Sequence, residues 1–437
     1  MSHLQKKLTL YGLTMIAVGS CIGSGIFVTP YQVVQAVPHH GWALLVWGLG
    51  GVIALTGALT FAELGGMFPQ AGGVYVYLRE AYGEWVGFLY GWVTLLVINT
   101  GALAALGIAL AEYLTFFMPL DQTGKVFVAI GVIAVLTAIN ILGVQISQLF
   151  ASTFTGLKLL AIVAIIAAGF IFYEPENVNL NLSLTQEVPD NLLSAILVGL
   201  IGVLWSFGGW HHASYLAGET KDAQRTVPRA MVLGAGIVTL TYVLVNLAYM
   251  MLLSLDEIAG TTRVAGDAIA TLLPSGGKLV AIAITVSIFG TIGIYTMSAP
   301  RIYFAMAKDG IFFKALSFVH PKFRTPVNAM LVQAIWAIIL LLFWGTFSNL
   351  ITYVTFMDIV FMTLAGASVL VFRKKRPSQN RPYRTFGYPV IPLIFVGVSG
   401  AFVMNTLIQR PEQAIAGLVL MGLGIGAYFA FRKTKEI

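Results

Sequence analysis

Two short glycine runs interrupt hydrophobic segments of this chain, in positions suited to holding a small polar ligand. The first run is Gly23-Ser24-Gly25, and the second, Gly208-Gly209, follows about 185 residues later. An unpaired backbone group in lipid costs several kcal/mol, so a broken helix is tolerated there only where the break lines a cavity. Breaks at corresponding places in two halves of one chain indicate the binding site of a transporter.

The polarity of the two breaks favours a ligand that carries a positive and a negative charge. The half-helix that begins near Ile26 turns free amides toward the first break, which favours a carboxylate. The half-helix that ends near Cys21 presents carbonyls, as do Trp205 and Gly208 at the second break, and these favour an ammonium group. The alternative is helix packing, because small residues are common where membrane helices meet. Because the two breaks occur at corresponding places, a binding site for a zwitterion is favoured over helix packing.

The composition places these breaks in a polytopic, all-α membrane protein. Of the 437 residues, 58% are hydrophobic and 10% are charged, whereas a soluble domain has roughly 25% charged residues. A span needs about 20 mostly apolar residues to cross a bilayer. Twelve spans are predicted, at 10–36, 41–66, 85–117, 125–144, 152–172, 191–218, 229–253, 277–304, 326–345, 348–372, 388–408 and 412–431.

The distribution of basic residues indicates a multi-pass protein of the cell membrane with both termini in the cytoplasm. In that orientation 20 of the 25 lysines and arginines fall in cytoplasmic segments, and Lys158 falls inside a span. The four on the outer side are Lys125, Arg263, Lys278 and Arg410. This bias accounts for the net charge of +7 without a nucleic-acid partner. The basic run 373–376 is expected to retain its loop inside, with a grip on anionic lipid as the alternative.

The whole chain, 1–437, is expected to form a single transmembrane domain. If the two breaks are equivalent, each repeat has five spans and the repeats cover about 10–172 and 191–372. An odd number of spans inverts the second repeat in the membrane, with the substrate held where the repeats meet. The last two spans, about 388–431, lie outside the repeat. The polar stretch 174–190 is expected to be an external loop.

A series of motifs in this chain resembles the amino acid–polyamine–organocation superfamily, and within it the L-type amino acid transporter family. The motifs occur in order at 22–30, 62–65, 69–75, 156–160, 208–210, 218–219, 227–230 and 301–309. The resemblance implies a leucine-transporter-type fold with twelve helices, a 5+5 inverted repeat and discontinuous helices 1 and 6. It implies substrate contacts from Cys21, Ile22, Gly23, Ser24, Gly25, Trp205, Ser206, Gly208 and Gly209. Trp205 takes the place of a gating aromatic that is usually phenylalanine, and its larger ring favours small neutral amino acids.

Lys158 is expected to take part in coupling. A lysine in the middle of a span costs about 2.5–3.5 kcal/mol and marks a functional site by default, although snorkelling to an interface is the alternative. In the family this lysine stands where sodium-coupled relatives hold sodium. It would connect the first break to the eighth span through Thr291 or Ser298, which predicts sodium-independent transport.

His211 and His212 depart from the family pattern. A histidine can titrate near neutral pH, so His212 is a candidate coupling residue, with a neutral hydrogen-bond partner as the alternative. No carboxylate is assigned to the pocket, which argues against cationic substrates. Glu63 is expected to pair with a loop base such as Arg79, and Asp358 is as consistent with gating or helix pairing as with substrate contact.

The leading functional prediction is an exchanger of small neutral L-amino acids that works by alternating access. The alternative is a proton-coupled symporter of the same substrates, and a membrane-embedded enzyme or receptor is more remote. No metal or other cofactor is expected, since Cys21 is the only cysteine and no nucleophile with its base is found. Animal members of the family tether a glycoprotein through an external cysteine that this chain lacks, so no disulfide-linked heavy subunit is expected.

Overall fold

The structure is a computed structural model that describes residues 4–176, 178–185, 191–343, 347–409 and 411–435. Within these ranges the regular structure is helical, apart from one isolated bridge between Leu8 and Thr220. Ten helical segments there are long and apolar enough to cross a membrane, and two further apolar helices are shorter, Val327–Phe343 and Gly417–Phe431. These lengths and compositions agree with a polytopic membrane protein.

The first half of the chain contains one helix for most predicted spans and several for the first and third. Its helices are α1 (Leu10–Cys21), α2 (Gly25–Val28), α3 (Pro30–Ala36), α4 (His40–Met67), α5 (Val74–Tyr82), α6 (Glu84–Val93), α7 (Asn99–Leu114), α8 (Gln122–Ile141) and α9 (Val144–Ile171). The predicted external loop 174–190 is irregular where it is described, and residues 177 and 186–190 lie outside the described residues.

The second half begins with another interrupted segment. Its helices are α10 (Leu192–Phe207), α11 (His212–Tyr215), α12 (Ala223–Leu252), α13 (Leu255–Gly260), α14 (Val264–Ala270), α15 (Gly276–Ser298), α16 (Pro300–Lys308), α17 (Val327–Phe343), α18 (Phe347–Lys375), α19 (Val390–Gln409) and α20 (Pro411–Lys435). The short helical turns η2 (Ala217–Glu219) and η3 (Lys314–Ser317) lie between them. The predicted boundary between spans 326–345 and 348–372 falls partly on 344–346, outside the described residues.

Both predicted breaks are confirmed. In the first, α1 ends at Cys21, residues 22–24 form a bend, and α2 begins at Gly25. In the second, α10 ends at Phe207 and residues 208–211 form turns before α11. Because each break exposes the backbone groups that a continuous helix would pair, these are the places where main-chain atoms can hold a ligand.

The third predicted span contains an irregularity that the sequence did not indicate. Between α6 and α7 the chain forms a π-helical segment, η1 (Thr94–Ile98). Such segments are rare and occur mostly as single turns inside α-helices, frequently at functional sites. Here the segment begins at Thr94 and ends directly before Asn99, both of which are buried.

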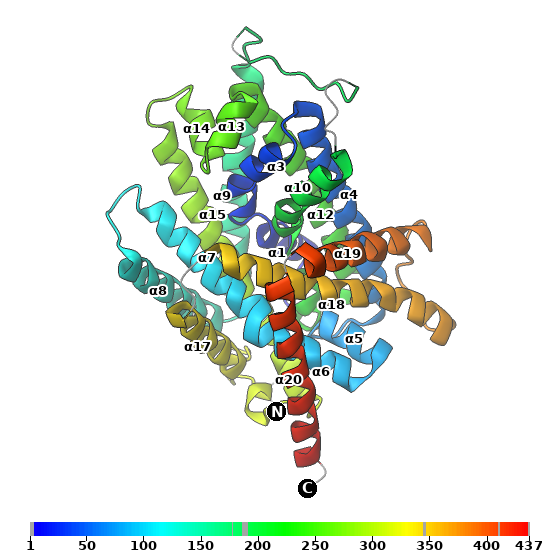
Figure 1. Cartoon of the computed structure of the whole chain (residues 1–437). Coiled ribbons are helices and arrows are strands. Elements are labelled where there is room, and N and C mark those ends of the chain that lie inside the picture. The colour runs from blue at the N-terminus through cyan, green and yellow to red at the C-terminus, as the bar shows by residue number, and fades with distance from the viewer. Residues whose placement is uncertain (1–3, 177, 186–190, 344–346, 410, 436–437) are drawn as a thin grey trace.

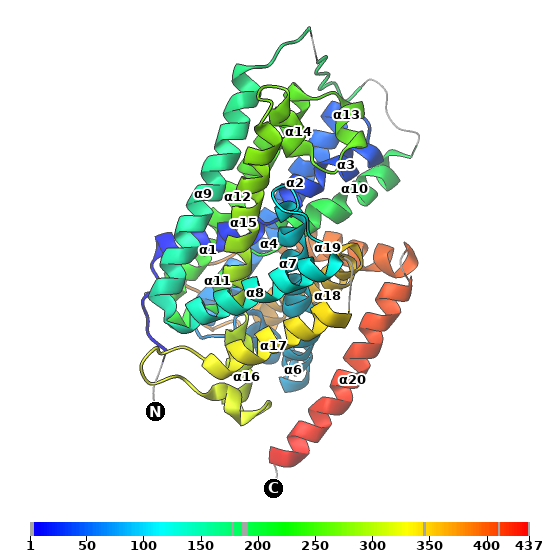
Figure 2. The same cartoon turned by 90° about the vertical axis from the view of Figure 1, so that its left-hand side faces the viewer.

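The broken helix α1 lies inside the bundle, where it packs against α9, α12 and α15. Figure 1 shows α1 near the centre, with α4, α10 and α12 close by and the long helix α20 extending away from the body. Figure 2, turned by 90°, shows α20 along the edge of the bundle and the two chain ends toward the same end of the molecule. The breaks are therefore enclosed by other helices and do not face lipid.

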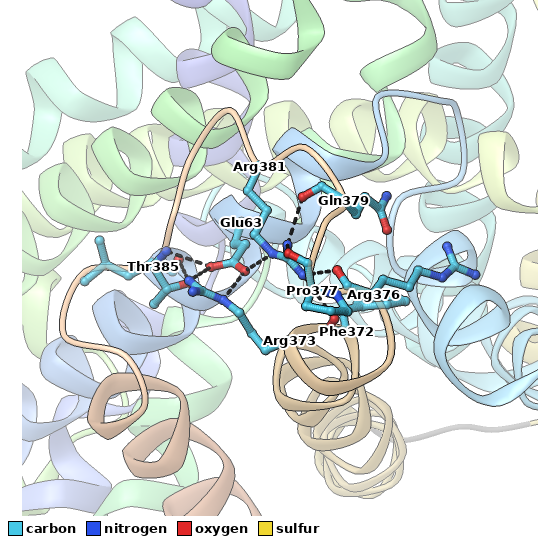
Figure 3. A network of polar contacts seen from close by, with 9 residues as sticks. Glu63, Phe372, Arg373, Arg376, Pro377, Gln379, Arg381 and Thr385 are labelled. Carbon is cyan, nitrogen blue, oxygen red and sulfur yellow. Dashed lines mark hydrogen bonds and ion pairs between the residues drawn. The ribbon is translucent and has the colours of Figure 1, made fainter.

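Glu63, at the end of α4, is the centre of a network of polar contacts (Figure 3). Its fully buried carboxylate accepts two hydrogen bonds of 2.8 Å from Arg373, one of 3.1 Å from Arg381 and one of 2.8 Å from the amide of Thr385. The predicted pairing of Glu63 with a loop base is confirmed by Arg381, but Arg79, given as the example, is not the partner, because residues from distant parts of the chain satisfy the Glu63 oxygens. The network fastens the end of α18 and the loop after it to α4.

Arg79 instead pairs with acidic residues nearer to it in space. It contacts Glu80 at 2.8 Å and also forms an ion pair with Asp309, just after α16. Glu80 in turn pairs with Arg376 at 2.9 Å. Burial alone would raise the pKa of Glu80, but its hydrogen bonds to Arg79 and Arg376 outweigh burial and hold this pKa below its usual value. At least two residues of the basic run 373–376 therefore have structural ion pairs.

A second buried pair joins the segment after α11 to α16. Arg301 donates to the two carboxylate oxygens of Glu219 at 2.7 and 2.9 Å, and both side chains are fully buried. The carbonyl of Glu219 accepts the amides of Lys7 and Leu8, at 2.8 and 2.9 Å. A bidentate pair of this kind is directional as well as strong, so it fixes the segment that leads into α1 against the one that follows the second break.

Candidate functional site

The two breaks lie in direct contact with each other. The hydroxyl of Ser20 donates to the carbonyl of Gly209 at 2.8 Å, and the thiol of Cys21 points to the carbonyl of Phe207 at 3.7 Å. On the far side of the first break, the hydroxyl oxygens of Thr29 and Ser206 are 3.0 Å apart. Segments almost 190 residues apart in sequence thus share one small volume.

This close approach requires glycine at two positions. Gly209 has φ +117°, and a Cβ atom there would lie 2.6 Å from the carbonyl oxygen of Ser20. A Cβ atom on Gly25 would lie 2.5 Å from the hydroxyl oxygen of Ser206 and 2.9 Å from its Cα. Glycine alone has both the backbone freedom and the missing side chain that these contacts demand. Gly23 differs, since a Cβ atom there would meet its neighbours at an ordinary 3.6 Å.

Tyr242 on α12 bridges the two breaks, which the sequence analysis missed. Its buried hydroxyl lies 2.9 Å from the carbonyl oxygen of Cys21 and 3.0 Å from that of Ser206. A hydroxyl has one proton, so it cannot satisfy both carbonyls fully. The carbonyl of Cys21 also accepts the amide of Gly23 at 2.8 Å, so the carbonyl of Ser206 keeps the larger part of its capacity to accept from an ammonium group. A tyrosine within an apolar span gives no sequence signal of this role.

Replacing Tyr242 with phenylalanine is expected to slow substrate exchange roughly three- to tenfold, because one shared hydrogen bond is worth about 0.5–1.5 kcal/mol. The initial rate of labelled substrate exchange in proteoliposomes measures the effect. Tyr249→Phe is the matched control: Tyr249 is also buried on α12, but its hydroxyl has no partner among the described residues. Equal rates for both variants and the original protein would contradict a role for the Tyr242 bridge.

A cavity of about 60 Å³ lies between the breaks. It is lined by eight of the nine residues predicted to contact substrate, and by His212; the eight are Cys21, Gly23, Ser24, Gly25, Trp205, Ser206, Gly208 and Gly209. Within the described part of the chain, the backbone amides of Ser24 and Gly25 have no hydrogen-bond partner. Helix α2 is only four residues long, so these amides, rather than a helix dipole, provide the attraction for an anion.

Ile22 lies in the first break but does not line the cavity. Its carbonyl oxygen is occupied by protein donors: it accepts from Lys158 Nζ at 2.7 Å, Thr291 Oγ1 at 2.9 Å and Ser287 Oγ at 3.1 Å. Its role is therefore to anchor the break, since its carbonyl has no capacity left for a ligand.

Lys158 on α9 is buried and bonded to neutral oxygens. Its Nζ atom donates to the carbonyls of Gly19 at 3.0 Å and Ile22 at 2.7 Å, and to the hydroxyl of Thr291 at 2.9 Å. The predicted connection from the first break to the eighth span through Thr291 is thus confirmed. Ser298 is not a partner of this lysine. The ammonium group fills the point at which several backbone and hydroxyl oxygens converge, which is where a bound cation would otherwise sit.

His212 on α11 is held by a hydrogen bond. Its Nδ1 atom lies 2.6 Å from the hydroxyl oxygen of Ser298, and its ring lies 4.2 Å from that of Tyr295. This contact agrees with the alternative in which His212 serves as a hydrogen-bond partner, and its charge state and titration stay predictions. Trp205 is half-buried and lines the cavity, as expected for an aromatic residue next to the substrate.

The sequence assigns no carboxylate to the pocket and leaves substrate contact by Asp358 open, and the structure places this carboxylate at the cavity. Asp358 on α18 lines the cavity, and its Oδ1 atom is buried without a hydrogen-bond partner among the described residues. The sequence could not place it, because an acid within a span looks the same whether it faces a cavity or a neighbouring helix. Because an acid lines the cavity, the argument against substrates with a cationic side chain no longer holds. Whether such a side chain fits depends on the size of the cavity.

Comparison with known proteins gives a match along nearly the whole chain. Residues 8–427 match the family described as amino acid permease. The serine/threonine exchanger SteT of Bacillus subtilis is 34% identical over 99% of this chain and 98% of its own length. The mouse b(0,+)-type amino acid transporter 1 is 30% identical over 98% of this chain and 88% of its own. The rat large neutral amino acids transporter small subunit 2 is 31% identical over 98% of this chain and 80% of its own length.

Proposed function

The chain belongs to the amino acid permease family, and from this premise we propose that it exchanges small neutral L-amino acids across the cell membrane without sodium. Its relatives are amino acid transporters and not enzymes. A membrane-embedded enzyme is therefore set aside, and amino acid transport is the activity that the family supports. Exchange agrees with the similarity to the Bacillus subtilis relative, which is a serine/threonine exchanger.

One observation carries this proposal: free amides and partly satisfied carbonyls face the same cavity between two broken helices. The amides of Ser24 and Gly25 would receive the substrate carboxylate. The carbonyls of Cys21 and Gly208 would receive its ammonium group, with Tyr242 already sharing one proton with Cys21. Both charged ends of the zwitterion would bind main-chain atoms, which every α-amino acid can do. Selectivity among amino acids would therefore depend on the residues that contact the substrate side chain.

Sodium independence is proposed from the position of Lys158. Its ammonium group occupies the convergence of the Gly19 and Ile22 carbonyls. A second cation at this point would be repelled by a like charge in a medium of low dielectric constant. The fixed charge of the lysine would therefore replace a transported ion as the link between the first break and α15.

The membrane arrangement completes the proposal. Twelve spans are proposed with both termini in the cytoplasm, and the repeats would cover about 10–172 and 191–372, inverted relative to each other. The chain 1–437 would work as one transmembrane domain in the lipid bilayer. It has no disulfide-linked heavy subunit, because its only cysteine, Cys21, is buried between the breaks.

Small substrates are proposed from the size of the cavity and from Trp205. A water needs at least about 10–15 Å³ of such space, so 60 Å³ has room for only a few non-hydrogen atoms beyond those held at the breaks. Trp205 narrows this space where the family usually has a phenylalanine. A long side chain would require the walls to move apart.

The test is exchange by the purified protein in proteoliposomes. Labelled alanine or serine outside is expected to enter only when unlabelled amino acid is present inside, at the same rate with sodium or choline as the external cation. A panel of unlabelled amino acids then defines the substrate range. Uptake into empty vesicles that follows an imposed pH gradient would favour the proton-coupled alternative, and dependence on sodium would contradict the role given to Lys158.

A further inference from the structure

The cavity between the breaks contains four buried polar side-chain atoms that have no hydrogen-bond partner among the described residues. They are Ser24 Oγ, Asn99 Oδ1, Thr355 Oγ1 and Asp358 Oδ1. A buried polar atom without a partner costs free energy, so each one in a native protein needs an explanation. Four of them on the wall of one cavity indicate a ligand that completes their bonds.

Three of the four atoms belong to residues outside the two breaks. Ser24 belongs to the first break itself. Asn99 is the first residue of α7, directly after the π-helical segment η1. Thr355 and Asp358 are three residues apart on α18, so they share one face of that helix. Two separate helices thus bring polar atoms to the part of the cavity that a substrate side chain would reach.

The chemistry of this wall calls for a donor. The amide nitrogen of Asn99 lies 3.4 Å from the carbonyl oxygen of Tyr295, to which it donates, so its Oδ1 atom, an acceptor, is the one left free. A carboxylate is likewise an acceptor only. The substrate ammonium group is already assigned to main-chain carbonyls at the breaks. A hydroxyl on the side chain of the substrate can supply such a donor, and it can also accept from the unpartnered hydroxyls of Ser24 or Thr355.

We propose that Asp358, together with Asn99, accepts a hydrogen bond from a side-chain hydroxyl of the substrate, so that this protein selects serine and threonine over alanine and valine. The inference rests on the proposed function and adds a specificity-determining residue to it. A hydroxyl is favoured over a long cationic side chain because the cavity measures about 60 Å³. Asp358 is half-buried as a residue, although its Oδ1 atom is buried.

The size of the expected preference follows from the cost of leaving Asp358 unpaired. An apolar pocket distinguishes side chains that differ by one small group only weakly, whereas a site built to bond a hydroxyl rejects the analogue that lacks it, since its own polar groups stay unsatisfied. Partial exposure of Asp358 moderates this penalty. We expect a ten- to hundredfold preference within each of the pairs serine/alanine and threonine/valine.

The experiment measures how well each unlabelled amino acid inhibits exchange of labelled alanine by the full-length protein in proteoliposomes. Threonine and valine are nearly equal in shape, so their ratio isolates the hydroxyl. In the original protein, serine and threonine should inhibit at concentrations at least tenfold below those of alanine and valine. In Asp358→Ala the members of each pair should inhibit at concentrations within about twofold of each other. Most of this change should come from weaker inhibition by serine and threonine. Thr363→Val, on the same helix but not on the cavity wall, should keep the original ratios.

A second variant and a second readout guard against misfolding. Asp358→Asn keeps the shape and one acceptor oxygen, so it should retain part of the preference. The rise in unfolding temperature of the detergent-purified protein on adding serine, compared with alanine, reports binding without transport. Ratios near one in the original protein, unchanged ratios in Asp358→Ala, or stronger inhibition by lysine or arginine than by serine would each overturn the inference. Failure of every amino acid to exchange would instead overturn the proposed function, and this inference with it.

Discussion

Replacing Lys158 with alanine is expected to reduce amino acid exchange at least 100-fold, to the background of protein-free vesicles. The ammonium group donates three hydrogen bonds of 2.7–3.0 Å from a fully buried position. Hydrogen bonds to charged groups are worth about 1.5–3 kcal/mol each, and 1.36 kcal/mol corresponds to a tenfold change in rate. Without this anchor the first break loses its bonds to α9 and keeps only the hydroxyl bonds from Ser287 and Thr291 of α15, so the amides of Ser24 and Gly25 are held less firmly.

The measurement is the initial exchange rate in sodium-free buffer, normalised to the amount of folded transporter. Lys278→Ala is the matched control, since Lys278 lies on α15 but is exposed, and this variant should exchange at the original rate. A Lys158→Ala protein that purifies as a monodisperse species but does not exchange would agree with the prediction. Full exchange by that variant would show that the first break holds its shape without the lysine.

A single methyl group at Gly209 or Gly25 is expected to lower exchange more than tenfold. In Gly209→Ala the new Cβ atom would meet the Ser20 carbonyl at 2.6 Å, at a φ of +117° that alanine rarely adopts. Backbone strain of this kind costs of order 1–3 kcal/mol, and the clash adds to it because the obstacle is main chain. In Gly25→Ala the methyl group would push Ser206 away. Either change separates the breaks that form the site.

The control substitutions are made at glycines where an added methyl group has free space. A Cβ atom on Gly48 of α4 or Gly131 of α8 would meet no atom within 4 Å. Because alanine is a better helix former than glycine by about 1 kcal/mol, Gly48→Ala and Gly131→Ala should be as active as the original protein and as stable or more so. Exchange rate and unfolding temperature are measured for all four variants. Normal exchange by Gly209→Ala would mean that the breaks need not touch during transport.

The parts of the site that could be predicted from the sequence are those with a local signal. Glycine pairs in apolar spans and a lysine in the middle of another span are unusual enough to stand out. They led to the breaks around Gly23 and Gly208 and to the connection between Lys158 and Thr291, all of which the structure contains. Each of these features follows from the cost of a bare polar group in lipid.

The parts that could not be predicted depend on how distant helices pack. Glu63 is expected from the sequence to pair with a loop base such as Arg79, and it does pair with a loop base, but this is Arg381, and its other partner, Arg373, is 310 residues away in sequence. Tyr242 and Asp358 give no local signal, because the helix face that meets the cavity is decided by tertiary contacts. The π-helical turn before Asn99 also escaped prediction, since residues 94–98 are ordinary helix formers for a membrane span.

The network around Glu63 has a mechanical consequence for the wall that carries Asp358. Helix α18 runs without interruption from Phe347 to Lys375, and Asp358 and Arg373 are 15 residues apart on it, which is about 22 Å at 1.5 Å per residue. A continuous helix moves as a rigid body, so a tilt of the end that Glu63 holds is transmitted to the rest of α18. Any tilt of the end of α18 that holds Arg373 would therefore also move the carboxylate of Asp358 in the cavity wall.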